Sequence, residues 1–294
     1  MSTARIRIAT RASDLALWQA RYVAQRLAEL GHATDLVEVT TTGDASTAPL
    51  HELGVGVFVK AVQEAVLLGR ADLAVHSFKD LPATPAQGLE IAAVPPRGPR
   101  HDVLLLKPGA YEPASRPLPL RRGTRLATGA VRRTAQLAAL APDVLTEPIR
   151  GNVPTRVDKL RMTPVDGLVL AAAGLDRLDL DTSDLVRVDL DPAVFLPAPA
   201  QGALALEIRR GDPLGDVLTD LHDVGSYPEV AAERGLLSLL DAGCQLPFGA
   251  HAVRSEQGIT LHAWFRGASV TARERTPEGA AQAAYAMLQT GLEP

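Results

Sequence analysis

Five short polar segments combine hydroxyl, carboxylate, guanidinium or ammonium side chains, and each follows a run rich in apolar residues. They are Thr10-Arg11-Ala12-Ser13, Thr42-Gly43-Asp44, Ser77-Phe78-Lys79-Asp80, Thr128-Gly129 leading to Arg132-Arg133, and Arg150-Gly151-Asn152. A guanidinium group binds a carboxylate or phosphate through two parallel hydrogen bonds, which an ammonium group does poorly. The segments therefore predict binding of a small anion, a polycarboxylate or a phosphate, and leave the reaction open.

Two side chains could take part in covalent or proton-transfer chemistry. Cys244 is the only cysteine, and its thiolate would be a nucleophile, although most lone cysteines are inert small apolar residues. Asp80 could act as an acid or base at the end of a strand, or it could cap the turn before Pro82. The residues alone leave both alternatives open.

Several other chemistries are disfavoured. His76 and His101 belong to no HExxH or comparable pattern, so we expect no metal site. Gly54-Val55-Gly56 is not followed by the Gly-Lys-Ser/Thr of a phosphate-binding loop, and no complete GxGxxG pattern follows a strand. One cysteine excludes an internal disulfide bond and a multi-cysteine zinc site.

The composition is that of an ordinary globular protein. The chain has 294 residues, 46% of them hydrophobic, and a formal net charge of −4, which predicts two or three domains and gives no case for nucleic-acid binding. The 30 basic residues are 26 arginines and 4 lysines, which reflects either codon bias or bidentate anion binding. No stretch is apolar enough to span a membrane, and Arg5, Arg7 and Arg11 interrupt any signal-peptide core. We expect a cytoplasmic protein.

Two successive β-α-β-α-β units are predicted to position these motifs. The first has strands at 5–10, 36–40 and 71–76 and helices at 13–30 and 57–68, and the second has strands at 125–128, 144–149 and 167–172 and helices at 130–140 and 153–162. A further strand at 202–208 precedes a small α+β region with helices at 229–240 and 278–288 and strands at 251–254 and 259–265. In parallel sheets, ligands bind beyond the carboxyl ends of the strands. Two facing units would therefore form a cleft lined with arginines.

Five motifs, taken in order along the chain, resemble those of the porphobilinogen deaminase (hydroxymethylbilane synthase) family. They are Ile8-Ala9-Thr10-Arg11 with Leu15-Ala16-Leu17-Trp18-Gln19-Ala20, Ala74-Val75-His76-Ser77-Phe78-Lys79-Asp80-Leu81-Pro82, Arg150-Gly151-Asn152-Val153, Ala200-Gln201-Gly202-Ala203 and Gly243-Cys244-Gln245-Leu246-Pro247. The resemblance covers residues 5–265. It implies two periplasmic-binding-protein-like α/β domains, formed by 1–99 with 197–222 and by 100–196, followed by an α+β domain at 223–294 that carries the cofactor cysteine.

The resemblance also implies a reaction and a cofactor. Members of this family are transferases that condense four porphobilinogen molecules head to tail with loss of ammonia, and they release hydroxymethylbilane for tetrapyrrole and haem synthesis. The chain grows on a dipyrromethane primer made from substrate and attached by a thioether to the cysteine that matches Cys244. Asp80 matches the central catalytic acid of the family.

Matching positions supply the expected anion-binding residues. The cofactor carboxylates are assigned to Lys79, Thr128, Arg132 and Arg133; the incoming substrate to Arg11, Ser13, Arg150 and Arg156; and weaker roles to Ser77, Arg177 and Gln201. Each pyrrole carries an acetate and a propionate, so the longest enzyme-bound chain has more carboxylates than these arginines can pair. We therefore expect helix N-termini to contribute, or the growing chain to move past one reaction centre.

Four positions depart from the family pattern. Val55 stands where a lysine is usual, Thr42 replaces an arginine, and Gly129 and Ala130 replace a serine pair. These changes bear on substrate affinity, because backbone N–H groups at 129–130 could still hold a carboxylate.

Two alternatives come from other classes of protein. A non-catalytic binding protein with a two-lobed anion cleft would share the fold class, but the missing export signal and the glycine-flanked cysteine disfavour it. An anion-dependent transcription regulator would need a DNA-binding element, and none is evident. We expect a monomer that takes porphobilinogen as its small-molecule partner and contacts neither nucleic acid nor membrane.

Overall fold

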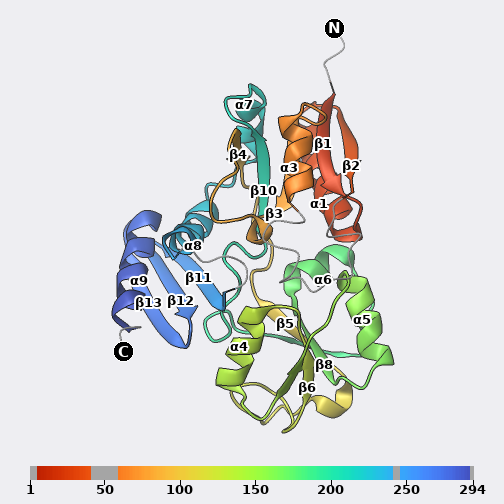
Figure 1. Cartoon of the computed structure of the whole chain (residues 1–294), viewed down its shortest axis with the longest axis vertical. Coiled ribbons are helices and arrows are strands. Elements are labelled where there is room, and N and C mark those ends of the chain that lie inside the picture. The colour runs from red at the N-terminus through yellow and green to blue at the C-terminus, as the bar shows by residue number, and fades with distance from the viewer. Residues whose placement is uncertain (1–4, 41–58, 241–245, 292–294) are drawn as a thin grey trace.

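Three β-sheets divide the described part of the chain into three regions. The structure is a computed structural model, and it describes residues 5–40, 59–240 and 246–291. Figure 1 shows the five-stranded sheet of domain 1 at the top, the five-stranded sheet of domain 2 at the bottom, and the three-stranded sheet of domain 3 at the left. No helix in these residues is both long and apolar enough to cross a bilayer.

The five-stranded sheet of domain 1 has four strands that run in one direction and one antiparallel strand. Its elements are β1 (Ile6–Arg11), α1 (Asp14–Glu29), β2 (Thr34–Val39), α3 (Lys60–Leu67), β3 (Leu73–Ser77), η1 (Phe78–Asp80), β4 (Leu89–Ala93), β10 (Leu204–Arg209), α7 (Leu214–Leu218) and η3 (Thr219–Leu221). The strand order is β2-β1-β3-β10-β4, and β10 is antiparallel to both β3 and β4. Helix α1 begins after the N-cap Ser13 and ends before Gly31, whose φ of 86° suits a glycine. Its buried face packs Ala20, Val23 and Leu27 on the sheet.

Domain 2 repeats this arrangement. Its elements are β5 (Asp102–Leu106), η2 (Pro108–Ala110), β6 (Arg125–Ala127), α4 (Val131–Leu140), β7 (Leu145–Glu147), α5 (Val153–Met162), β8 (Gly167–Ala171), α6 (Ala172–Leu178) and β9 (Val186–Asp189). The order β7-β6-β8-β5-β9 places antiparallel β5 in the fourth position, where β10 lies in domain 1. This shared topology confirms the predicted fold class of two periplasmic-binding-protein-like domains.

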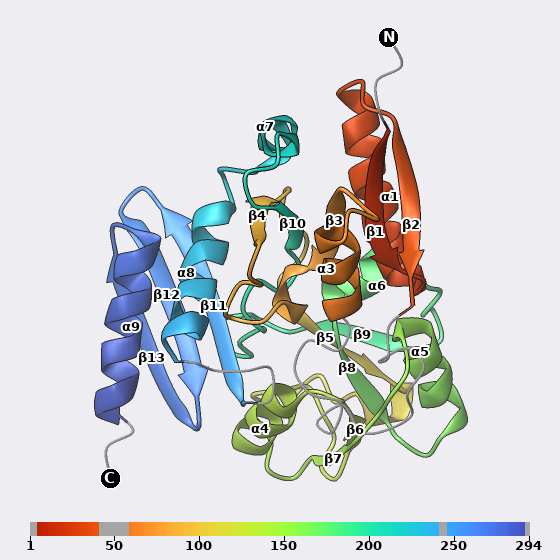
Figure 2. The ribbon, with the colours of Figure 1, turned by 45° about the horizontal axis from the view of Figure 1, so that its top comes forward.

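Domain 3 is the predicted α+β unit. Its elements are α8 (Tyr227–Leu239), β11 (Phe248–Ser255), β12 (Gly258–Phe265), β13 (Ala268–Glu274) and α9 (Pro277–Gly291). The three strands form an antiparallel sheet, and both helices cover the same face of it (Figures 1 and 2). Many of the buried side chains between helices and sheet are alanines, which lets these layers approach closely.

The three predicted strands of each β-α-β-α-β unit run parallel, as expected, and each sheet also contains one antiparallel strand. β5 and β10 run antiparallel to their neighbours because each enters its sheet directly from a segment that crosses between the domains, without a crossover helix. The sequence also gave no indication of β4, β5, β9, β13 or α6. β5 is buried throughout, so it lacks the apolar–polar alternation that identifies a half-buried strand.

Two chain segments, 94–101 and 190–203, connect domains 1 and 2 and lie against each other. Gly98 N donates to Gly202 O at 3.2 Å, and the Arg97 guanidinium donates to Gln201 O at 2.9 Å. Gly202 has a φ of 88°, and a Cβ at this position would lie 2.5 Å from Gly98 O. The contact therefore requires glycine at position 202 for both backbone conformation and space.

Domain 3 is anchored to the same crossing segments through one buried carboxylate. The Glu233 carboxylate of α8 accepts hydrogen bonds from both terminal nitrogens of Arg97, at 3.0 and 2.8 Å. It also accepts hydrogen bonds from the backbone N–H groups of Ala200 and Ala252. Glu233 is fully buried, and an unpaired buried charge costs roughly 3–5 kcal/mol. This set of hydrogen bonds fixes the position of α8 relative to both crossings.

The contact between the crossings generates a stability prediction. Gly202→Ala combines an unfavourable φ with a backbone clash, so we expect it to lower the free energy of unfolding by about 3 kcal/mol. The matched control is Gly211→Ala, where φ is 73° but nothing lies within 4 Å of the added Cβ, so only about 1 kcal/mol is expected. Urea unfolding measures both. Equal losses in the two variants would show that the crossings do not pack as described.

Candidate active site

Four of the five predicted polar motifs lie at the carboxyl ends of strands or at the beginnings of the following helices, and the fifth, Thr42-Gly43-Asp44, lies outside the described residues. Arg11 ends β1, Ser77 ends β3, and Thr128 directly follows β6. The predicted N-cap position of Ser13 is confirmed, and its side chain makes no capping hydrogen bond. Asn152 caps α5 by accepting from Thr155 N at 2.9 Å. Local sequence signals therefore place the motifs as predicted.

A cavity of about 100 Å³ lies where these motifs meet, between domains 1 and 2. Its polar lining residues are Gln19, Ser77 and Lys79 from domain 1 and Arg133, Arg156 and Arg177 from domain 2. Five of these were predicted as site residues, and Gln19 was not. Gln19 donates to the Ser77 hydroxyl at 2.8 Å, which fixes the end of β3.

The cavity is electropositive because cations are buried around it. Burial lowers the pKa of Lys79 to about 8, opposed by the nearby Asp80 carboxylate and reinforced by Arg133. Burial also lowers the pKa of Arg156 to about 10, and the charges of Arg133 and Arg150 act in the same direction while Asp80 opposes them. These electrostatic effects connect five side chains into one interacting group that contains four cations and one carboxylate. The five are Lys79, Asp80, Arg133, Arg150 and Arg156. Such a group binds anions strongly, since each added carboxylate relieves repulsion.

Arg177 closes one side of the cavity. It donates to Gly202 O at 2.7 Å and lies 5.4 Å from the Trp18 ring centroid, and burial lowers its pKa to about 10. Arg156 is similarly held, because it donates from Nε to Gly151 O at 2.7 Å. Both guanidiniums are thus oriented by backbone oxygens before any ligand binds.

The structure does not bring every predicted residue to the cavity wall. Those that lie outside its lining are Arg11, Ser13, Asp80, Thr128, Arg132, Arg150 and Gln201. Thr128 is buried, and its hydroxyl accepts from Ala130 N at 3.3 Å. Gln201 is fully buried and accepts from the Lys79 ammonium at 3.3 Å. Thr128 and Gln201 therefore support neighbouring site residues in this structure.

Arg132 and Arg133 share a partner that the sequence did not reveal. Asp102, at the beginning of β5, lies 2.7 Å from a nitrogen of each guanidinium and is fully buried. Arg133 also lines the cavity, whereas Arg132 turns to Leu196 O, at 2.6 Å, and to the ring of Phe195. The only sequence signal for Asp102 was its place after Arg100 and His101.

Asp80 lies on η1 with an exposed side chain, beside the cationic group that its charge influences. A carboxylate in this position can meet a ligand that enters the cleft. Cys244 lies outside the described residues, as do Thr42 and Val55. In the described parts of the chain, no group of three or more His, Cys, Asp or Glu side chains is placed to hold a metal ion.

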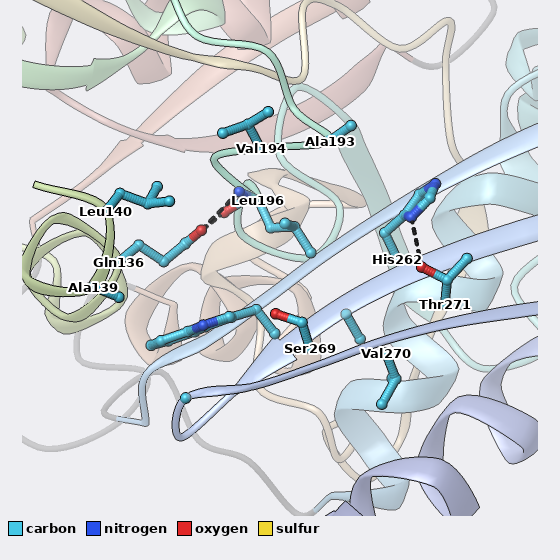
Figure 3. Close-up of a pocket in the computed structure, with 13 residues that line it drawn as sticks. Gln136, Ala139, Leu140, Ala193, Val194, Leu196, His262, Ser269, Val270 and Thr271 are labelled. Carbon is cyan, nitrogen blue, oxygen red and sulfur yellow. Dashed lines mark hydrogen bonds between the residues drawn. The ribbon is translucent and has the colours of Figure 1, made fainter. Parts of the chain in front are cut away.

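A second cavity, of about 300 Å³, lies between domains 2 and 3 (Figure 3). α4, the segment 193–196 and the face of the β12–β13 pair that the helices leave open form its wall. Its one titratable lining residue is His262, which is hydrogen-bonded to Thr271 at 3.0 Å. The larger cavity lacks the cluster of cations that lines the smaller one, so the smaller cavity is the better candidate for chemistry.

Comparisons with known proteins agree with the resemblance. Residues 6–215 match the family described as porphobilinogen deaminase, dipyromethane cofactor binding domain, and residues 227–286 match the porphobilinogen deaminase C-terminal domain. The porphobilinogen deaminase of Syntrophotalea carbinolica is 44% identical over 266 residues, which is 89% of this chain and 82% of that protein. The porphobilinogen deaminase of Thermus thermophilus is 46% identical over 256 residues, covering 85% and 81%.

Solved structures with similar folds include two binding proteins. An ancestral cationic amino acid solute-binding protein has a TM-score of 0.45 and 15% identity, and the comparison covers 77% of this chain and 93% of that one. A periplasmic substrate-binding protein of a Coxiella burnetii ABC transporter also has a TM-score of 0.45, with 13% identity and coverage of 78% and 96%.

The lowered pKa of Lys79 predicts a pH-dependent stability. Between about pH 8 and its ordinary value of 10.5, the unfolded chain keeps the Lys79 proton and the folded chain has released it. Stability conferred at this position therefore rises with pH in that window, by about 3 kcal/mol in total, and is constant below it.

Unfolding with and without Lys79→Met, compared from pH 7 to 10.5, measures this effect. The two proteins compared are Cys244→Ser and the double variant Cys244→Ser with Lys79→Met, so that no group attached at residue 244 adds negative charge. Lys107→Met, on the surface of domain 2, is the matched control. The account is contradicted if the Lys79→Met difference follows the same pH course as the control.

Proposed function

The chain belongs to the porphobilinogen deaminase family, and from this premise we propose which of its residues carry out the reaction. It is an enzyme that condenses porphobilinogen for tetrapyrrole synthesis, with dipyrromethane as its cofactor. The observation that supports the proposed site best is the cavity between domains 1 and 2. There, five residues predicted from the sequence, Ser77, Lys79, Arg133, Arg156 and Arg177, line one cationic cavity beside Asp80.

The residues at the cavity fit a group that carries carboxylates. Lys79, Arg133, Arg156 and Arg177 are cations with restricted access to water, and their nitrogens are potential donors to acetate and propionate oxygens. We assign Lys79 and Arg133 to the cofactor carboxylates, with support from Thr128 and Arg132. When bound, the cofactor supplies the free pyrrole carbon to which the first substrate is joined. Its proposed attachment point is Cys244.

Asp80 is the proposed catalytic residue. Loss of ammonia from porphobilinogen leaves a methylene-pyrrole cation, and joining it to a second pyrrole carbon produces a ring that must lose a proton. A carboxylate beside the pyrrole N–H groups stabilises the positive charge at both stages and can accept that proton. The charge of Asp80 interacts with the cations Lys79 and Arg156 beside it.

We assign the carboxylates of the incoming porphobilinogen to Arg11, Ser13, Arg150 and Arg156. Arg156 is held by Gly151 O, and Arg150 contributes to the charge around it. Arg11 and Ser13 lie at the end of β1 and the beginning of α1, where the N-terminus of α1 favours an anion. Porphobilinogen would therefore enter with its carboxylates toward these residues and its aminomethyl group toward Asp80.

A monomer in the cytoplasm that binds no nucleic acid completes the proposal. The single cysteine suits a reducing compartment, where a free thiol stays available for a thioether. The net charge of −4 gives no attraction to a nucleic-acid backbone.

Substitution of Asp80 tests the catalytic role. We expect Asp80→Asn to lower kcat by about 10²–10⁴-fold, since it removes both the charge and the proton acceptor, and Asp80→Glu to retain slow turnover. Ammonia release measures the rate. Asp143→Asn, an exposed aspartate of domain 2, is the control and keeps wild-type turnover. Near-normal turnover by Asp80→Asn would refute the assignment.

Intact-protein mass tests the attachment point. Wild-type protein is expected to be heavier than its sequence mass by two pyrrole units, and Cys244→Ser is expected to show the sequence mass and no ammonia release. Active wild-type protein without added mass would overturn the role of Cys244. A bare, inactive wild type would instead favour a binding protein.

A further inference from the structure

Asp102 is a fully buried carboxylate that accepts hydrogen bonds from three different side chains. Arg132 Nη2 donates at 2.7 Å, Arg133 donates from Nη2 at 2.7 Å and from Nε at 3.2 Å, and Gln201 Nε2 donates at 3.0 Å. The exposed fraction of Asp102 is 0%, so its carboxylate oxygens are not hydrogen-bonded to bulk water. The proposed reaction assigns no role to Asp102.

The position of Asp102 connects all the elements that define the cleft. It is the first residue of β5, directly after one interdomain crossing, and Gln201 belongs to the other crossing. The arginines lie in the first turn of α4. Gln201 also accepts from Lys79 of domain 1 at 3.3 Å, so a hydrogen-bonded chain from Lys79 through Gln201 and Asp102 reaches both guanidiniums.

Two adjacent guanidiniums need a counter-charge when both are buried. Arg132 and Arg133 are each 6% exposed. Burial by itself would raise the pKa of the Asp102 carboxyl, but the two guanidiniums outweigh it and hold that pKa well below its usual range. The two guanidiniums therefore favour the charged form of Asp102, which offsets one of the two positive charges. One positive charge of the pair, together with Lys79, remains for a ligand.

The same hydrogen bonds fix where the guanidiniums point. Arg133 uses Nε and Nη2 on Asp102 and Nη1 on Val169 O, at 2.9 Å, which leaves its plane no freedom to rotate while it lines the cavity. Arg132 donates to Leu196 O, and Gln136 holds both the N–H and the carbonyl of Leu196 (Figure 3). Arg132 is therefore held by Asp102 and Leu196 O, and Arg133 is held by Asp102 and Val169 O.

We propose that Asp102 is a positioning residue for anion capture: it holds Arg133 in the orientation that receives a carboxylate of the bound pyrroles, and it anchors Arg132 beside it. The proposal rests on the proposed function, because it takes the ligand to be a carboxylated pyrrole. Asp102 touches no reacting atom. Its effect reaches the ligand through Arg133 at the cavity wall and through Gln201, which holds Lys79.

The test compares Asp102→Asn with a matched control. Asp72→Asn also removes a carboxylate that lies beside two arginines, Arg7 at 2.6 Å and Arg209 at 3.8 Å, but in a part of domain 1 that does not line the cavity. Each purified protein is examined by intact-protein mass for the fraction carrying two pyrrole units, and by steady-state kinetics with porphobilinogen.

We expect Asp102→Asn to carry the added mass in a minor fraction of molecules and to raise KM by about tenfold or more, while kcat per modified molecule stays within about threefold. Asp72→Asn is expected to match wild type in added mass and KM even if its thermal midpoint falls. An Asp102→Asn protein with wild-type added mass and KM overturns the proposal.

Asp102→Glu separates positioning from charge balance. It keeps the counter-charge and is expected to fold, but it displaces the carboxylate, so we expect KM to rise several-fold. A wild-type KM would show that only charge balance matters, and failure of both Asp102 variants to fold would make Asp102 a folding residue; each result overturns positioning. If wild type itself carries no added mass, the proposed function fails instead.

Discussion

Positive charge buried around a single carboxylate is the constraint on which the rest of this structure depends. Lys79, Arg132 and Arg133 are gathered around Asp102 and Gln201 at the place where two domains meet. Such an arrangement costs free energy in the empty protein, because cations lose water and repel one another. The cost is offset partly by Asp102 and fully only when anions bind. Under the proposed function, the carboxylates of the bound pyrroles supply the remaining negative charge.

The scaffold has to hold these charges in place against their own repulsion, and its architecture shows how. The crossings pack through Gly98 and Gly202, and Glu233 of domain 3 binds Arg97 and the backbone of the second crossing. The carboxylates Asp102 and Glu233 therefore each hold arginine side chains next to the segments that cross between the domains. Asp102 organises the cations that face the cleft, and Glu233 fixes domain 3, the region assigned to carry the cofactor cysteine.

The sequence predicted the parts of this design that depend on local chemistry. The strand-end motifs and the Ser13 cap follow from short-range rules, and positions that match the family gave Lys79, Asp80 and Arg133 as candidates. Asp102 could not be predicted this way, because its partners are about 30 and 100 residues away and meet only when β5 enters its sheet in antiparallel orientation. The same long-range pairing explains why Arg132 turns from the cavity toward Leu196, which nothing in its own neighbourhood of the sequence indicated.

A crystal structure of the protein with its attached dipyrromethane tests the central claim most directly. The account predicts that carboxylates of the bound group lie within hydrogen-bond distance of Lys79 and Arg133, that Asp102 keeps its bonds to both arginines, and that the Asp80 carboxylate faces the pyrrole N–H groups. Carboxylates directed into solvent, with the Lys79 and Arg133 nitrogens still turned only to protein atoms, would contradict it.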